Sequence, residues 1–444
     1  MSSRHRTALA VLEEDPDQAA GIAHEILRED PHDKAALFIL GVVNSRAERF
    51  GTSIALYERI TRLDPRRHEA WNNLGMALME CGDYPNGRNA FKRALEIKET
   101  AGYIANVAAT YLQEGNPVEA LKWAKKSLNK GEDDKIWTTY GFANLGIGNW
   151  EEGWKGYEKC LGGRFRKIVQ VGEEPRWDGS DVENLFIYGE QGLGDEIMYA
   201  SCLEDAQKHA KHIVLECDKR LAGLFQRSFP EIEVHGTRRD EQNWAKGRTF
   251  DAGCAIGSLA YLFRPDRALC PRKPYLVADS ERRLQWRALF DSWGARVVGL
   301  AWTGGRVTTH KRERTIGLEA FRPLIQKYQA ERPTVFVSLQ YKEPFAEIEE
   351  TGLPVRHIAR GVQSPDYEDT AAFVMELDEV IGIHTTIHHL AGAMGKKSTV
   401  LVPSKPMWCY ATGDRLPWYP ENMFFRQKRD ESWADCIKRL TNER

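Results

Sequence analysis

Three short polar clusters in the later part of the chain have residue types and spacing suited to acid–base chemistry or anion binding. The first is the glycine-bearing loop Glu190-Gln191-Gly192-Leu193-Gly194-Asp195, which follows the apolar run 185–189. A carboxylate held on such a loop can act as a general base. The same acid can also cap the helix that begins there, and the two roles are compatible.

A dinucleotide-binding motif is the alternative interpretation of this loop. Gly192 and Gly194 match the first half of that fingerprint, and Glu216 stands where an acid would bind a ribose. Ile197 occupies the third Gly/Ala position and breaks the motif. We therefore favour the carboxylate interpretation.

The second cluster lies in 382–395, where a strand is expected to end and a helix to begin. Free backbone N–H groups at a helix start, together with the hydroxyls of Thr385 and Thr386, form an anion site suited to a diphosphate. His384, His388 and His389 raise the alternative of a metal site. No Glu accompanies them in an H-E-x-x-H arrangement and no further ligand is evident, so we predict no metal.

The third cluster is basic and follows another apolar run. It begins at Trp302 and continues through 310–315, which includes His310, Lys311 and Arg314. Cations on a loop at a strand end can neutralise a departing diphosphate. The alternative is a solvated basic loop without a ligand.

Apolar runs of strand length alternate with helical segments around these clusters. The expected strands are 185–189, 212–217, 232–235 and 250–256, then 296–302, 334–339, 379–383 and 398–402. This alternation predicts two parallel sheets covered on both faces, hence two Rossmann-like lobes separated by the Arg/Pro-rich stretch 264–280. Ligands bind at the carboxyl ends of such strands, so the predicted site lies between the lobes, with Gln340 and Lys342 facing it.

The N-terminal third is repetitive. Leu40-Gly41 and Leu74-Gly75 lie 34 residues apart, as do Tyr57 and Phe91, while Gly82, Gly115 and Gly148 recur every 33 residues. Small residues that let paired helices approach, followed by aromatic residues, are typical of tetratricopeptide repeats. We predict about four repeats over 34–165 and a degenerate copy at 5–33.

A short solenoid of this kind presents a concave groove that typically binds a peptide or protein. We therefore expect the repeats to bind a protein partner. Packing against the rest of the chain, or self-association into a homo-oligomer, remains the alternative.

Composition limits the classes of function. Sixty-two Lys and Arg balance 64 Asp and Glu for a net charge of −2, which does not favour a nucleic-acid partner, although a local basic patch stays open. No apolar run approaches the roughly 18 residues of a membrane span, and the N-terminal apolar run is too short for a secretory signal. Eight scattered cysteines without a C-x-x-C pair indicate free thiols, so we expect a cytoplasmic protein.

Seven short stretches carry a resemblance to a known family. They are Glu190–Asp195, Val298–Trp302, Arg314–Ile316, Ser338–Gln340, His389–Ala393, Pro417–Pro420 and Arg426–Gln427. In order and spacing, 183–440 resembles glycosyltransferase family nine, the heptosyltransferase-like enzymes of GT-B fold. The whole chain resembles bacterial and phage tetratricopeptide proteins that carry this domain, and its architecture is similar to that of protein O-linked N-acetylglucosamine transferases.

The resemblance implies a domain order and site roles. Repeats would occupy 1–165, an acceptor lobe 166–280, and a donor lobe with a C-terminal helix 281–444. Asp195 matches the family's loop base, with Gln191, Gly192 and Gly194 on the acceptor side. On the donor side stand Trp302, Lys311, Arg314, Gln340, Lys342, Thr385, Thr386 and His389, with His310 as a further candidate. His384 stands where the family has a sugar-contacting aspartate, so this chain departs from the pattern there.

The implied reaction is a single inverting displacement from a nucleotide-sugar, the co-substrate, to an acceptor hydroxyl, for which we expect a protein. No Asp-x-Asp occurs after residue 166, which fits an enzyme that needs neither metal nor other cofactor. The alternative is a non-catalytic scaffold whose decayed transferase body binds nucleotide or nothing, an interpretation favoured by His384.

Two expectations concern the end of the chain. The aromatic stretch 408–425 could line an acceptor site, but we favour a packing role. Helix 431–440 is expected to cross back to the first lobe, as in GT-B chains.

Overall fold

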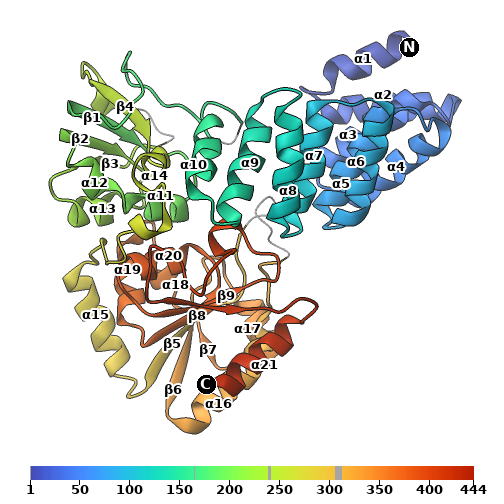
Figure 1. The fold of residues 1–444 in the computed structure, drawn as a ribbon. Helices are drawn as coiled ribbons and strands as arrows, with labels where there is room; N and C mark the ends of the chain where they lie inside the picture. The colour runs from blue at the N-terminus through green and yellow to red at the C-terminus, as the bar shows by residue number, and fades with distance from the viewer. Residues whose placement is uncertain (1, 165, 239–241, 306–312) are drawn as a thin grey trace. The chain divides into compact units, whose positions relative to one another are not determined.

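The computed structural model describes residues 2–164, 166–238, 242–305 and 313–444. Two compact units divide the chain, Met1–Ile147 and Gly148–Arg444. Lys311 and His310 lie outside the described residues. The first unit is helical and the second is α/β, as the sequence predicts (Figure 1).

The first unit is a run of antiparallel helices that pack on their neighbours in chain order (Figure 1). They are α1 Ser3–Val11, α2 Pro16–Glu29, α3 Lys34–Arg46, α4 Phe50–Leu63, α5 His68–Glu80, α6 Tyr84–Ile97, α7 Ala101–Gln113, α8 Pro117–Leu128 and α9 Asp134–Gly146. Gly82 and Gly115 follow α5 and α7 with φ of 78° and 80°, a conformation that glycine adopts most easily. The degenerate copy and the first three repeats that follow it are present as the helix pairs α1–α2, α3–α4, α5–α6 and α7–α8. Of the predicted fourth repeat, α9 belongs to this unit, whereas its second helix lies beyond the unit's end at Ile147.

Close contact between paired helices depends on their small residues. A Cβ at Gly75 of α5 would lie 2.7 Å from Cε1 of Phe91 and 3.0 Å from the carbonyl oxygen of Gly87, both on α6. The glycine therefore lets the Phe91 ring lie directly against the backbone of α5.

Gly75→Ala is expected to lower the free energy of unfolding of the first unit by about 1–3 kcal/mol, because the added methyl overpacks this contact. Gly21→Ala is the matched control. Position 21 lies inside α2 with nothing within 4 Å of its Cβ, so the substitution should stabilise by about 1 kcal/mol through helix propensity. Urea unfolding of both variants measures the difference, and equal effects would contradict this account.

Helix α10, Trp150–Lys159, belongs to the second unit. By its pattern it is the second helix of the last repeat, yet its aromatic side chains pack within the α/β body. The ring of Trp154 is fully buried, with its centroid 5.4 Å from that of Trp408 and 6.1 Å from that of Tyr199.

The first lobe of this unit has a four-stranded parallel sheet of order β3-β2-β1-β4. Its strands are β1 Val182–Tyr188, β2 Ala210–Glu216, β3 Glu233–His235 and β4 Ala252–Ala255. Its helices are α11 Leu193–Ala200, α12 Leu203–Ala206, α13 Ala222–Ser228 and α14 Ser258–Phe263, with 3₁₀ turns η1 Asn243–Ala245 and η2 Arg267–Leu269.

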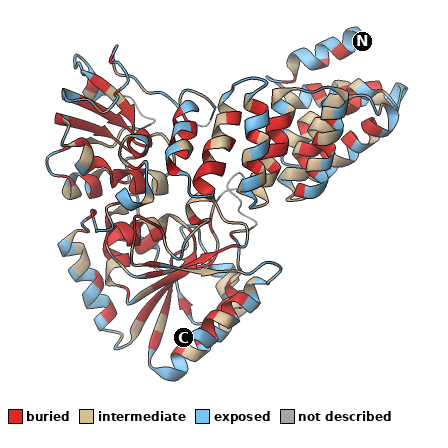
Figure 2. Ribbon diagram, in the orientation of Figure 1, coloured by how far each residue is buried: buried red, intermediate tan, exposed pale blue. Residues whose placement is uncertain are grey.

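The second lobe has a six-stranded parallel sheet of order β10-β9-β8-β5-β6-β7. Its strands are β5 Arg296–Ala301, β6 Thr334–Ser338, β7 Val355–Arg356, β8 Glu379–Ile383, β9 Ser398–Val402 and β10 Asn422–Arg426. Its helices are α15 Ser280–Asp291, η4 Leu318–Phe321, α16 Arg322–Glu331, α17 Phe345–Thr351, α18 Ala359–Val362, α19 Tyr367–Glu376, α20 Thr386–Ala393, η5 Trp408–Tyr410 and α21 Trp433–Glu443. Buried residues run along the central strands of both sheets (Figure 2), as expected of parallel sheets covered on both faces.

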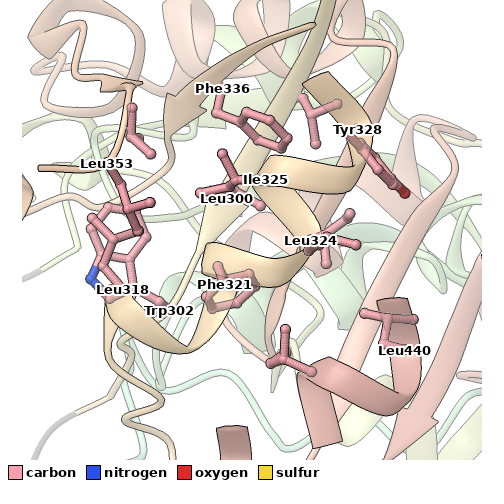
Figure 3. Packing of buried hydrophobic residues seen from close by; sticks show 14 of the residues in the cluster. Leu300, Trp302, Leu318, Phe321, Leu324, Ile325, Tyr328, Phe336, Leu353 and Leu440 are labelled. Carbon is pink, nitrogen blue, oxygen red and sulfur yellow. The ribbon is translucent and has the colours of Figure 1, made fainter. Parts of the chain in front are cut away.

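The C-terminal helix does not cross back to the first lobe, so that prediction is wrong. Ile437 and Leu440 of α21 join the core of the second lobe beside η4 and α16 (Figure 3). The ammonium group of Lys327 on α16 donates to the carbonyl oxygen of Thr441 at 2.9 Å. The apolar face of α21 is thus buried within its own lobe.

The closing aromatic stretch packs, as we favoured. Trp418 and Tyr419 are buried, and the Trp418 ring centroid lies 5.3 Å from that of Trp150 on α10. Strand β10 follows directly and was not predicted.

Candidate functional site

The loop that follows β1 carries Asp195 into the first turn of α11. Its Oδ2 accepts a hydrogen bond from the backbone N–H of Gly192 at 3.1 Å, so the carboxylate caps the helix. The residue is only half-buried, which leaves part of it accessible. Asp195 therefore caps the helix as predicted. This hydrogen bond uses Oδ2 and does not involve the other carboxylate oxygen, Oδ1.

Two of the predicted clusters meet at the start of α11. A Cβ at Gly194 would lie 3.4 Å from Cδ2 of His389 and 3.5 Å from Oγ1 of Thr386, both on α20 of the second lobe. We call this contact between the first turns of α11 and α20 the lobe junction. Each helix begins just after the carboxyl end of a strand, α11 after β1 and α20 after β8, which is the end of an open parallel sheet where ligands bind.

Burial raises the pKa of Asp195 above its ordinary value. The Gly192 N–H bond and the positive charges of Arg238 and Arg314 oppose that shift by favouring the ionised form. A carboxylate with a raised pKa is a stronger base than a free aspartate.

Arg238, which follows β3, holds the loop from one side. Its guanidinium donates to the carbonyl oxygen of Gln191 and forms ion pairs with Glu196 at 2.6 Å and Asp218 at 3.2 Å. Its side chain is 6% exposed. Burial raises the pKa of Glu196 to about 7. Arg238 was not among the predicted site residues, because nothing in the sequence near it distinguishes it from a surface arginine.

Arg314 reaches the lobe junction from the basic cluster. It is buried, and its Nη2 donates to the carbonyl oxygen of His384 at 2.6 Å. Burial lowers its pKa from the ordinary value. Among the described residues of the predicted basic cluster, Arg314 is the cation that lies near Asp195 at the lobe junction.

Two histidines at the α20 start pack against Tyr410. The His384 ring centroid lies 4.6 Å from that of Tyr410, and Nε2 of His389 lies 3.1 Å from the Tyr410 hydroxyl. Burial lowers the pKa of His389 to about 3, so it is neutral at pH 7. Thr385 is the N-cap residue of α20, with extended backbone. Tyr410 lies in the aromatic stretch 408–425, for which we favoured a packing role over an acceptor wall.

His388 points into the core of the second lobe instead. Its Nε2 lies 3.0 Å from the carbonyl oxygen of Gly382, and its Nδ1 lies 3.1 Å from Oγ of Ser398. Because a carbonyl only accepts, Nε2 carries the proton and Nδ1 accepts from the serine. Within the described ranges, no three His, Cys, Asp or Glu side chains group as metal ligands would.

The neutral His388 should make stability depend on pH. Burial lowers its pKa in the folded protein to about 4, against about 6.5 in the unfolded chain. Its contribution is complete above pH 6.5 and is lost as the pH falls towards 4, an effect of about 3 kcal/mol. His388→Asn should therefore unfold with a shallower pH dependence over this range than the wild type. Denaturant titrations at pH 7 and 4.5 give the free energy of unfolding of each protein. An equal change in this free energy between the two pH values in wild type and variant would contradict the role of His388.

Three other predicted donor residues do not join the lobe junction. Trp302 is fully buried in the core of the second lobe (Figure 3), and its indole N–H donates to Glu347 at 2.6 Å. Its side chain is therefore unavailable to a ligand, which corrects that prediction. The amide of Gln340 faces the backbone of Thr303, and Lys342 is exposed beyond the carboxyl end of β6.

Comparisons with known proteins identify the first unit. The tetratricopeptide repeat family matches residues 9–65 and 45–102, so the chain carries these repeats at its N-terminus. The chain is 29% identical over 87 residues to the general transcriptional corepressor ssn6 of Schizosaccharomyces pombe, a match that covers 20% of this chain and 8% of that protein.

A longer match includes residues of both units. The chain is 28% identical over 410 residues to Protein FlbA of Caulobacter vibrioides, covering 85% of this chain and 67% of FlbA. The chain thus spans about two thirds of that relative's length. Because the first unit ends at Ile147, the similarity must extend into the α/β unit.

Similar solved structures cover about a third of the chain. The crystal structure of MamA matches 36% of this chain and 94% of its own, with 21% identity and a TM-score of 0.33. The match to the tetratricopeptide protein TTC0263 of Thermus thermophilus covers 36% of this chain and 88% of TTC0263, with 18% identity and a TM-score of 0.32. In the part of the chain that the structure describes, no helix combines the length and apolar character needed to cross a bilayer.

Proposed function

We propose that the chain is an inverting glycosyltransferase that moves a sugar from a nucleotide-sugar to a hydroxyl of a protein acceptor, without a metal ion. The observation that carries the proposal is the lobe junction. A carboxylate with a raised pKa lies at the carboxyl end of one parallel sheet, and a helix start with threonines and a buried arginine lies at that of the other.

Each residue has a step in the proposed displacement. Asp195 removes the proton from the acceptor hydroxyl as the oxygen attacks the anomeric carbon. The bond from that carbon to the diphosphate breaks, and the leaving group takes its electron pair. The N–H groups and hydroxyls at Thr385 and Thr386, with Arg314, stabilise the developing negative charge. His389, neutral at pH 7, supplies hydrogen bonding without adding charge.

The repeats supply the acceptor in this proposal. Tetratricopeptide repeats present extended surfaces suited to peptides and proteins. A chain that joins them to a transferase body could hold a protein near Asp195 at a raised local concentration. The repeats would then select the substrate, while the lobe junction would do the chemistry.

A non-catalytic scaffold is the second candidate, and His384 favours it. The resemblance places a sugar-contacting acid at this position, whereas here a buried histidine packs against Tyr410. A body of this kind would bind nucleotide or nothing, and the repeats would be the working surface.

Release of nucleoside diphosphate from a panel of UDP-, GDP-, ADP- and TDP-sugars, with cell extract as acceptor source, tests the proposal. We expect release from one donor that depends on the extract. A thermal shift with the matching nucleotide should accompany it, since a ligand at 100 times its Kd stabilises by about 2.7 kcal/mol. A thermal shift without release would favour a nucleotide-binding scaffold. Neither signal with any nucleotide would overturn the proposal.

A further inference from the structure

Arg166 is the buried centre of an ion-pair network beside the candidate site. Its side chain is 0% exposed and pairs with Glu190, whose side chain is also 0% exposed, at 2.7 Å. It also pairs with Glu158 at 3.0 Å. Glu158 lies on α10, whereas Glu190 is the first residue of the loop that carries Asp195. One guanidinium therefore joins the helix to the loop.

Further contacts fix the guanidinium itself. Its Nη1 donates to the carbonyl oxygen of Tyr157 at 2.7 Å, its Nη2 donates to Oγ of Ser258 at 3.1 Å, and its Cζ lies 4.0 Å from the centroid of the Tyr157 ring. Nε and Nη2 both reach the Glu190 carboxylate, an arrangement that lysine cannot reproduce.

The Glu190 carboxylate packs closely against the backbone between β4 and α14. A Cβ at Gly257 would lie 2.6 Å from Oε1 of Glu190, so that side of the carboxylate is closed. Removing one member of a buried pair leaves an uncompensated charge, which strongly disfavours the native arrangement. Burial already raises the pKa of Glu190, and the Arg166 charge opposes that shift. Loss of Arg166 would therefore remove the cation that favours the ionised Glu190 in this place.

We propose that Arg166 is a positioning residue that holds the 190–195 loop against α10 and thereby fixes the carboxylate of Asp195. The loop is short, and Arg238 anchors it again at the carbonyl oxygen of Gln191. These two contacts fix the loop backbone from Glu190 onward. That backbone leads to the hydrogen bond between the Gly192 N–H and the Asp195 carboxylate. The catalytic part of this inference rests on the proposed transferase function.

Hydrogen exchange of the full-length protein tests the positioning without requiring activity. Arg166→Met should raise amide exchange in peptides covering 191–196 at least tenfold and leave β6 of the second lobe unchanged. Arg176→Met is the matched control, because Arg176 pairs with Glu158, is 52% exposed in its side chain and does not touch Glu190. Its 191–196 peptides should exchange as in the wild type. Unchanged exchange in Arg166→Met would overturn the proposal.

Kinetics separate positioning from general stability. Arg166→Met should lower kcat at least tenfold with the KM for the donor within twofold, because the donor side lies in the other lobe. Arg166→Lys should recover only part of the rate. The double variant Arg166→Met/Glu190→Gln removes the Glu190 charge that Arg166→Met leaves unpaired, while Glu158 keeps Arg176 as its partner. It should recover thermal stability but not kcat. Recovery of both would assign Arg166 a structural role only and overturn the proposal. A wild type inert with every donor would refute the transferase function, while the exchange result would still decide the positioning.

Discussion

Asp195→Asn is expected to lower the rate of nucleoside-diphosphate release by about 10²–10⁴-fold, the range typical of a lost general base. The amide keeps the shape of the side chain and can still accept the Gly192 N–H bond that caps α11. It cannot take up a proton. The loss should therefore appear in kcat, with the thermal stability of the protein little changed.

Glu204→Gln is the control for this substitution. Glu204 is an acid of the same lobe that pairs with Lys273 on the surface, away from the lobe junction. Its replacement should leave the rate within twofold of the wild type. Equal losses in both variants, or an unchanged rate in Asp195→Asn, would remove Asp195 as the base.

The second large effect is on stability. Trp154→Ala should lower the free energy of unfolding of the Gly148–Arg444 unit by about 3–5 kcal/mol, because the indole is fully buried among Tyr157, Tyr199 and Trp408. Exchange in β1 should rise accordingly, while α5 and α6 of the first unit should keep their wild-type protection.

Trp293→Ala provides the comparison. Trp293 is half-buried, and Cζ of the Arg356 guanidinium lies 4.6 Å from the centroid of the Trp293 ring. Trp293→Ala should lower the free energy of unfolding by less than half as much as Trp154→Ala. If exchange in α5 and α6 rose with that in β1 in Trp154→Ala, α10 would have to be reassigned to the repeats.

Much of the fold could be predicted because its signals are local. The glycines at the helix turns, the 34-residue offset and the apolar runs of β5, β8 and β9 each reflect backbone or burial requirements of their own segment. Strand β7 has two residues and leaves too short a pattern. The amphipathic face of α21 indicates that it packs, but not against which lobe, so its partner could not be predicted.

The candidate site was predictable in part for a related reason. Both loops follow the carboxyl ends of parallel strands, so the sequence predicts that they face the same site between the lobes, and Gly194 and Thr386 do lie close together. Trp302 also follows a strand, yet its side chain turns into the core, a choice that the sequence does not encode locally. The roles of Arg166 and Arg238 depend on partners distant in the chain, and charge alone does not reveal them.

Transfer of a labelled sugar to a protein tests the central claim most directly. The wild type and Asp195→Asn would be incubated with the active donor, labelled in its sugar, and with cell extract, followed by intact-mass and peptide mass spectrometry. We predict that one or more proteins gain the mass of one sugar residue with the wild type and not with the variant. Labelled free sugar without any labelled protein, or equal labelling by both enzymes, would contradict the account.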